Sequence, residues 1–357
     1  MTSSIHNYFQ LFSWQQFDLN NLRHRLYTSR PLLIEWICIE EISTGLMPEY
    51  RVFCEYLDSN PAAHLHILVS TPDIEWLPQR DRVEYEPYIV NFFHQAKHHI
   101  IDTHRYDAQA LPPPVEFTPK RFNYKFCALN HRGHIFRCKI VDEYARQELF
   151  QDDVLISWNN VSMPDPNVFQ FKYFTPRKII IPGDNFYNSE GSYNSYRLPA
   201  IYNDAAFSVI AESSPDQFFV TEKTTTALWF YKPFIIFGSV GFNHYLRDEL
   251  GFKIFEEVFD YSFDYEKDLD QRVEGFVREV KKLSAMSLDE ISDVYAALKD
   301  KIIHNRHRAY NILYDQKFWP KKFVEWKKYM YDKSVTIGDT SRKDLFVLQT
   351  EHMFNSL

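Results

Sequence analysis

The residues whose types and spacing best suit chemistry lie between Phe207 and Gly238. This stretch reads as a buried strand, a polar loop, a helix and a second strand. The helix would begin at Thr221-Glu222-Lys223, where free main-chain N–H groups and the positive end of the helix dipole suit a diphosphate. Lys223 would add a cation, and Glu222 could accept both hydroxyls of a ribose. The alternative is an ordinary helix start, in which Thr221 is only the N-cap and Lys223 is solvated.

The same stretch resembles the donor-binding motif of α1,3-fucosyltransferases, in which a strand ending in Phe-Glu-Asn-Ser leads through a short loop to Tyr-(Ile/Val)-Thr-Glu-Lys. In that family the Glu-Lys pair binds the ribose and phosphates of the nucleotide. The matching positions are Glu212, Ser214, Val220, Thr221, Glu222 and Lys223; the departures are Ala211, Ser213 and Phe219, where the family has Phe, Asn and Tyr. The family's Asn and Tyr lie close to the donor. The resemblance therefore places Glu212, Ser213 and Phe219 in a nucleotide-sugar site with Thr221, Glu222 and Lys223, while the donor need not be GDP-fucose.

A second stretch, Lys125 to Arg132 followed by Arg137, is similar to the start of the donor domain in fucosyltransferase-like and exostosin-like enzymes. There an Arg on the helix after the first strand reaches the pyrophosphate. Arg137 matches that position best and Arg132 is the alternative, although either could be an ordinary surface residue. A third stretch, from Leu246 to Arg272, resembles glycosyltransferase-like proteins of phages and other microbes, and its acids are interpreted as caps and surface charge. The three stretches cover less than half of the chain.

The elements that must position these residues alternate between strands and helices, which predicts parallel sheets covered on both faces. Expected strands are 32–40, 64–70, 124–129, 178–181, 207–211, 234–237 and 253–255; expected helices are 88–101, 135–150, 221–231 and 243–250, followed by a helical tail. The prolines at 112–114 suggest a linker. We therefore expect an α/β protein of the glycosyltransferase-B type with two Rossmann-like domains. The expected limits are 1–115 for the acceptor side, 120–285 for the donor side and 286–357 for C-terminal helices.

Composition narrows the possible functions. The 357 residues carry a net charge of -8 and only 9 glycines, so a strongly basic nucleic-acid binder and a glycine-rich phosphate loop are both disfavoured. Cys38, Cys54, Cys127 and Cys138 lie singly and are expected to be reduced core thiols. The acids of Asp268-Leu269-Asp270 are interpreted as first-turn acids of a helix, so no metal or other cofactor is expected. Without a signal peptide or an apolar run of 18 residues, we expect a cytoplasmic protein with no membrane span.

The resulting hypothesis is a glycosyltransferase that moves a sugar from a nucleotide-diphosphate donor to a hydroxyl acceptor, by inverting, metal-independent transfer. Glu40 and Glu41, at the end of an expected strand, are the candidates for the general base. A glycan acceptor is favoured over DNA because of the net charge. Two alternatives stay open: a phage-type enzyme that glycosylates hydroxymethylated DNA bases, and a non-catalytic sugar-nucleotide or glycan-binding protein of the same fold.

Overall fold

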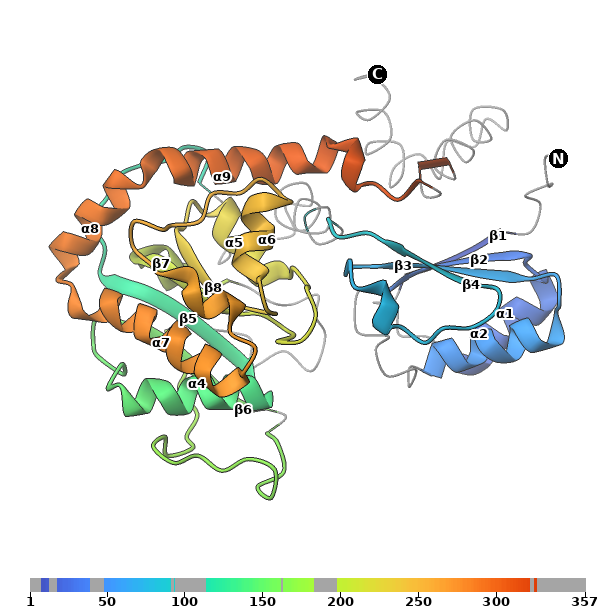
Figure 1. Ribbon diagram of the computed structural model, residues 1–357, viewed down its shortest axis with the longest axis horizontal. Helices are drawn as coiled ribbons and strands as arrows, with labels where there is room; N and C mark the ends of the chain where they lie inside the picture. Colours follow the sequence, from blue (N-terminus) through green and yellow to red (C-terminus); the bar gives the residue numbers. More distant parts are fainter. Residues whose placement is uncertain are drawn as a thin grey trace. The chain divides into compact units, whose positions relative to one another are not determined.

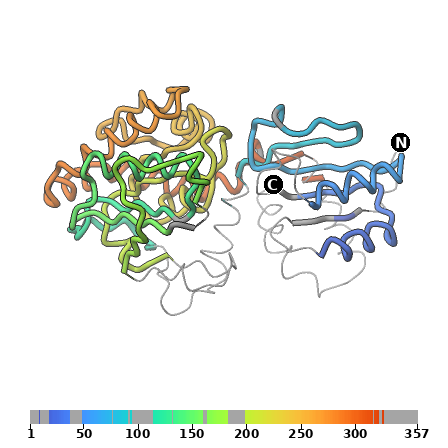
Figure 2. Tube along the Cα trace, turned by 90° about the horizontal axis from the view of Figure 1, so that it is seen from below, coloured from blue at the N-terminus to red at the C-terminus, as the bar shows by residue number. Residues whose placement is uncertain are grey.

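The computed structural model describes residues 8–12, 18–38, 48–90, 93, 114–161, 163–182, 198–321 and 324–325. They belong to two compact units (Figures 1 and 2). Unit 1 draws on Met1–Asn91 and Leu313–Leu357, and unit 2 on Phe92–Ile312. Each described unit contains a four-stranded parallel sheet, so the expected α/β class with parallel sheets is confirmed. The glycosyltransferase-B arrangement and the domain limits given above stay predictions.

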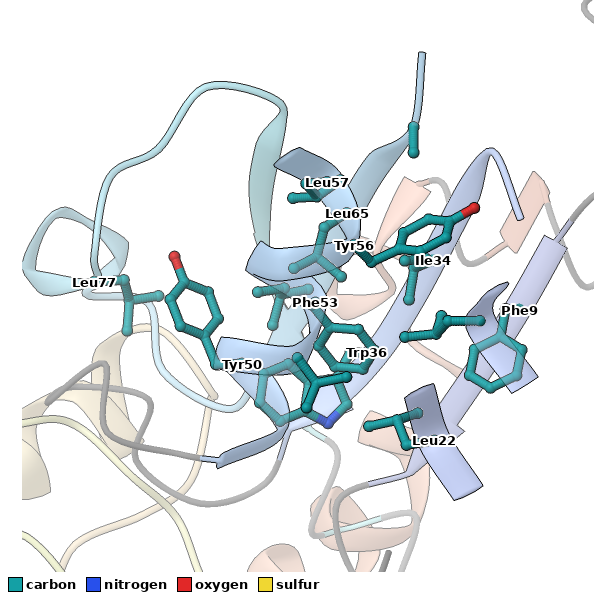
Figure 3. Close-up of a cluster of buried hydrophobic side chains, with 14 of the residues drawn as sticks. Phe9, Leu22, Ile34, Trp36, Tyr50, Phe53, Tyr56, Leu57, Leu65 and Leu77 are labelled. Atoms are coloured by element: carbon teal, nitrogen blue, oxygen red, sulfur yellow. The ribbon is translucent and has the colours of Figure 1, made fainter. Parts of the chain in front are cut away.

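Unit 1 is a β/α alternation with strand order β1-β2-β3-β4. Its elements are β1 (Tyr8–Phe12), α1 (Leu19–Ser29), β2 (Leu33–Cys38), α2 (Pro48–Ser59), β3 (His64–Val69), the 3-10 turn η1 (Ile74–Trp76) and β4 (Val83–Pro87). Alternate strand residues such as Ile34, Trp36 and Leu65 belong to one hydrophobic cluster with Leu22 of α1 and Phe53 of α2 (Figure 3). Trp36 is fully buried in this core.

Strand residues that alternate with this cluster are polar and still buried. Glu35 and His66 are paired across β2 and β3, and His66 Nε2 lies 3.1 Å from Glu86 Oε2 of β4. The C-terminal part of the chain returns to this unit. The main-chain N–H of Lys321 donates to Glu86 Oε1 at 2.7 Å, and the rings of Trp319 and Tyr88 lie 6.2 Å apart.

Unit 2 has strand order β6-β5-β7-β8, all parallel. Its strands and helices are β5 (Tyr124–Arg132), α4 (Ile135–Arg146), β6 (Leu155–Val161), β7 (Ala205–Ala211), α5 (Glu222–Trp229), β8 (Phe234–Phe237), α6 (Phe242–Asp248), α7 (Leu269–Ala285), α8 (Leu288–Ala297) and α9 (Lys299–Asn311). Its short 3-10 turns are η4 (Ala200–Asp204) and η5 (Tyr261–Tyr265); η6 (Ile312–Tyr314) follows α9 at the limit of the unit, and η7 (Gln316–Phe318) belongs to unit 1. α4 packs on α7, and α5 packs on α9 (Figure 1).

The strand order creates a topological switch point between β5 and β7. The chain leaves β5 through α4 toward β6, and leaves β7 through α5 toward β8, in the opposite direction across the sheet. Right-handed crossovers then put α4 and α5 on opposite faces. At such a point the two helices diverge and leave a crevice outside the carboxyl ends of the strands, where ligands of open α/β sheets bind.

Several expected elements are corrected. Lys253 to Phe255 is not a strand; instead, the Asn305 side chain accepts from the Lys253 N–H at 2.7 Å and donates to its carbonyl at 2.8 Å, which replaces sheet pairing. The expected strand at 178–181 is reduced to one antiparallel bridge between Ile179 and Trp158. The expected helix at 88–101 lies almost wholly outside the described residues. The helices expected at 135–150, 221–231 and 243–250 are confirmed within a few residues, and Cys127 and Cys138 are buried free thiols as expected.

Candidate functional site

The loop from β7 to α5 is fixed by a buried carboxylate rather than by glycine. Glu212, fully buried directly after β7, accepts hydrogen bonds from the Thr221 main chain at 3.1 Å, the Thr221 hydroxyl at 2.5 Å and the Thr224 hydroxyl at 2.5 Å. Its own N–H donates to the Phe237 carbonyl of β8 at 2.9 Å. Glu212 therefore orients the first turn of α5, and its oxygens are occupied by the protein itself.

Thr221 is the N-cap of α5, as its position in the sequence suggested, and its hydroxyl accepts from the Lys223 N–H at 3.3 Å. Lys223 folds back over this turn. Its ammonium donates to Glu222 Oε1 at 2.9 Å, to the Thr221 hydroxyl at 3.2 Å and to the Ser213 hydroxyl at 3.4 Å. Desolvation raises the pKa of the Glu222 carboxyl, but the Lys223 charge and hydrogen bond outweigh it, and the pKa lies below its usual value. Together with Glu212, five of the predicted residues therefore meet at this helix start.

Arg137 reaches the start of α5 from α4, the helix that follows the neighbouring strand β5. It lies in the first turn of α4, is 3% exposed, and donates through Nη2 to the carbonyls of Ala211 at 3.1 Å and Glu212 at 2.9 Å. Within the described residues its Nε has no hydrogen-bond partner. Burial lowers the pKa of the guanidinium to about 10, although Glu212 and Glu222 oppose this. The hydrogen bonds of this buried guanidinium go to neutral carbonyls, so Glu212 and Glu222 offset its charge only through space.

The sequence did not single out His134, which the structure adds to the site. His134 is the exposed N-cap of α4, and its ring stacks on Phe136 at 5.8 Å between centroids. Burial and three cations, Arg137, Arg132 and Lys223, lower its pKa to about 4. Arg132, the last residue of β5, is half-buried. No sequence signal marked it, because His is not among the Ser, Thr, Asp and Asn residues that typically precede a helix.

The rest of the loop is held from α7 and α6. Arg272 of α7 is buried and donates to the Pro215 carbonyl at 2.9 Å, and Phe218 stacks on Phe242 of α6 with 4.8 Å between ring centroids. The Ser214 hydroxyl accepts from the N–H groups of Asp216 and Gln217 at 3.3 and 3.2 Å. Phe219 is half-buried in this loop. The loop is thus fixed by side chains over its whole length.

The start of α6 lies at the end of β8, the strand next to β7, and is built differently. Asp264, buried in η5, accepts from the main-chain N–H of Asn243 at 2.9 Å and of His244 at 3.2 Å, and from Asn243 Nδ2 at 2.7 Å. His244 Nδ1 lies 2.9 Å from Asp264 Oδ2. Burial raises the pKa of the Asp264 carboxyl despite these bonds. The interpretation of Asp264 as a cap is confirmed.

The remaining predicted residues are placed as follows. Glu40 and Glu41 lie outside the described residues and stay predictions. Asp268 is the N-cap of α7, where it accepts from the Gln271 N–H at 2.9 Å, and Asp270 pairs with Lys139, so both act as first-turn acids as expected. In the described part of the chain no three His, Cys, Asp or Glu residues are grouped in a way that could hold a metal ion. None of the helices described there is both long and apolar enough to span a bilayer.

Comparison with known proteins shows similarity to solved structures. No protein-family model matches the chain, and no curated protein matches it. The chain is similar to a crystal structure of an α1,3-fucosyltransferase, with 12% sequence identity, a TM-score of 0.34, and coverage of 87% of this chain and 93% of the other. It is also similar to an α1,3-fucosyltransferase with GDP-fucose, at 11% identity, a TM-score of 0.34, and coverage of 84% and 92%. Similarity at this level leaves the function to be inferred from the chain's own residues.

Proposed function

We propose that the chain is a glycosyltransferase whose donor is a nucleoside-diphosphate sugar, bound by unit 2 at the switch point between β5 and β7. The observation that carries the proposal is the meeting of Arg137, Lys223 and two helix N-termini at the carboxyl ends of these neighbouring strands. Main-chain N–H groups at helix starts and nearby cations are the two features that bind a diphosphate. The motif that contains Glu222 and Lys223 links this anion site to sugar nucleotides.

Each site residue then has a distinct role. Arg137 already spans the ends of β5 and β7, and its buried Nε, which has no hydrogen-bond partner among the described residues, would need a small side-chain movement to meet a phosphate oxygen. The bond from Lys223 to Ser213 is the longest of its three at 3.4 Å, so a phosphate oxygen would replace that one. Glu222 is half-exposed beside Lys223 and would accept the ribose hydroxyls. Glu212 and Thr221 act indirectly, because they hold the α5 turn in position.

For the reaction we propose inverting transfer to a hydroxyl acceptor without a metal ion. The leaving diphosphate would be stabilised by Lys223, Arg137 and the N–H groups of α4 and α5, since preorganised donors stabilise developing negative charge. A general base would remove the acceptor proton, and Glu40 and Glu41 are its candidates. The net charge of -8 favours a carbohydrate acceptor over DNA.

The donor site is tested by calorimetric titration with UDP, GDP, ADP and CDP, using wild type and Lys223→Ala. A charge-assisted hydrogen bond contributes about 1.5–3 kcal/mol, so Lys223→Ala should weaken the preferred nucleotide on the order of tenfold to a hundredfold. Lys299→Ala, at an exposed lysine that begins α9, is the matched control and should leave affinity unchanged. Unchanged affinity in Lys223→Ala, or no affinity for any of the four nucleotides, contradicts the proposal.

The transfer step is tested with the corresponding nucleotide sugar and simple glycoside acceptors. Glu40→Gln and Glu41→Gln separate the two base candidates, since only loss of the true base abolishes turnover at unchanged nucleotide affinity. Loss of all turnover in a chelator, or a product that keeps the donor's anomeric configuration, refutes the mechanism. Sugar transfer to hydroxymethylated duplex DNA, with no transfer to glycosides, would show that the acceptor is DNA and not a carbohydrate.

A further inference from the structure

His134 is a neutral side chain among positive charges at the start of α4. Its main-chain carbonyl begins the helix by accepting from the Cys138 N–H at 2.9 Å, while its side chain makes no capping bond. Its ring lies nearly parallel to that of Phe136, at 9°, and the Arg137 guanidinium lies 5.4 Å from the centroid of the same Phe136 ring. In the described part of the chain no hydrogen bond reaches either ring nitrogen of His134. The imidazole is therefore partly exposed, held against the Phe136 ring and without a hydrogen bond among the described residues.

The charges that face His134 come from three elements. Arg132 ends β5, Arg137 lies in the first turn of α4, and Lys223 lies in the first turn of α5; all three disfavour a fourth positive charge. The nearby carboxylates are already engaged. Glu212 binds the start of α5, and Glu222 is paired with Lys223. The imidazole of the free protein therefore stays neutral at ordinary pH, with burial and these cations as the cause.

We infer that His134 is a ligand of the bound diphosphate and that it takes up a proton when the diphosphate binds. This inference rests on the donor site proposed above. A disubstituted diphosphate brings two negative charges, which offset two of the three surrounding cations and favour imidazolium. The imidazolium then donates a charge-assisted hydrogen bond to a phosphate oxygen. Donor binding is thereby coupled to proton uptake at one residue.

The sign of the pH effect follows from linkage. The pKa of His134 is about 4 in the free protein, and bound diphosphate raises it toward or above the ordinary value of 6.5. Between these two pKa values the complex holds more protons than the free protein, so donor affinity rises as pH falls from about 7 toward 4. One proton allows at most about a tenfold change in affinity per pH unit.

The experiment measures proton uptake by titration calorimetry with UDP-glucose, GDP-mannose and GDP-fucose. These donors carry no group that titrates between pH 5 and 8 on the diphosphate, unlike free nucleoside diphosphates with a terminal phosphate pKa of about 6. Titrations at pH 6.0 in MES and in Bis-Tris, buffers of different ionisation heat, give the number of protons taken up. We expect roughly half a proton to one proton in wild type, and none in His134→Gln, whose affinity should be independent of pH.

Two further variants complete the test. His134→Asn offers a favourable N-cap residue if the Gln variant loses stability. His307→Gln, at an exposed histidine of α9, is the matched control and should keep the proton uptake. Donor binding without proton uptake in wild type, or uptake that persists in both His134 variants, overturns the inference while leaving the donor site intact. Failure of all three sugar nucleotides to bind overturns the donor site and this inference together.

Discussion

The helices α4 and α6 begin on the same edge of the unit 2 sheet, but their free main-chain N–H groups are treated in opposite ways. At α6 the first N–H groups all have acceptors: Phe242 donates to the Ser239 carbonyl, and Asn243 and His244 donate to the Asp264 carboxylate. At α4 the N–H groups of Ile135, Phe136 and Arg137 have no acceptor within the described residues. Since each helix start carries about half a positive charge, α6 is neutralised internally and α4 is not.

The positive charge at the start of α5 is neutralised by the protein to a degree between those of α4 and α6. It has an internal carboxylate, Glu212, but that group binds the N-cap residue and a threonine hydroxyl, not the N–H groups further along the helix. Lys223 then adds a positive charge that only a half-exposed Glu222 offsets. The comparison shows how a buried carboxylate distinguishes a structural helix start from one suited to an external anion.

The largest expected effect comes from removing the internal anion of α6. Asp264→Ala leaves the main-chain N–H groups of Asn243 and His244 without their acceptor and removes one of the two acceptors of the Asn243 amide, which should cost roughly 3 kcal/mol of unfolding free energy. Urea denaturation of wild type and variant measures this. Diphosphate affinity of the folded variant should stay within about twofold, because α6 is not part of the donor site. Strong loss of diphosphate affinity at unchanged stability would instead show that Asp264 belongs to the sugar-nucleotide site.

A smaller effect is expected when α4 is made to resemble α6. His134→Asp supplies a carboxylate N-cap, which should stabilise the protein by about 1 kcal/mol. The same carboxylate competes with the diphosphate for the α4 N–H groups and the cations, so nucleotide affinity should fall by roughly tenfold or more. Denaturation and calorimetric titration of one preparation give both numbers. His307→Asp is the control for added negative charge. Equal nucleotide affinity in wild type and His134→Asp would mean that the diphosphate does not bind at the start of α4.

The smallest effect concerns Glu222 at α5. The pKa of its carboxyl is below the ordinary value of 4.5. The ionised group therefore stabilises the fold fully above about pH 4.5, and this contribution disappears as pH falls through the lower, folded pKa. Because Glu222 is half-exposed, the gain is only a few tenths of a kcal/mol. The difference in unfolding free energy between wild type and Glu222→Gln should shrink as pH falls from 6 to 3. A difference that grows toward low pH would mean that folding raises the pKa of Glu222 and would contradict the prediction.

How much the sequence predicted depends on whether the signal was local. The α5 start was predictable because Thr221, Glu222 and Lys223 are consecutive and a helical pattern follows them. The strand β4 was not, since Val-Glu-Tyr-Glu-Pro lacks an apolar run and becomes a strand only through its pairing with β3. The stretch Lys253 to Phe255 is apolar enough for a strand, yet a side chain of α9 takes the place of the partner strand.

The site shows the same limit. Arg137 was expected near the donor, but the sequence could not show that its guanidinium binds the carbonyls at the end of β7, because those residues are over 70 positions away. Likewise, the resemblance associated Glu212 with the donor, whereas the structure gives its oxygens to the α5 turn. Residues that hold a site in place are recognised only once the strands are paired.

The return of the chain to unit 1 has a consequence for synthesis on the ribosome. Unit 2 is one continuous segment, so all of its described contacts are available once residue 312 has left the exit tunnel. Unit 1 is not a continuous segment. Tyr88 contacts Trp319, and Glu86 accepts from the main chain of Lys321, so both contacts can form only after more than 230 further residues have been synthesised. Domains generally fold as units during synthesis, the N-terminal one first. In this chain unit 2 should mature first, and the N-terminal sheet should complete its packing last.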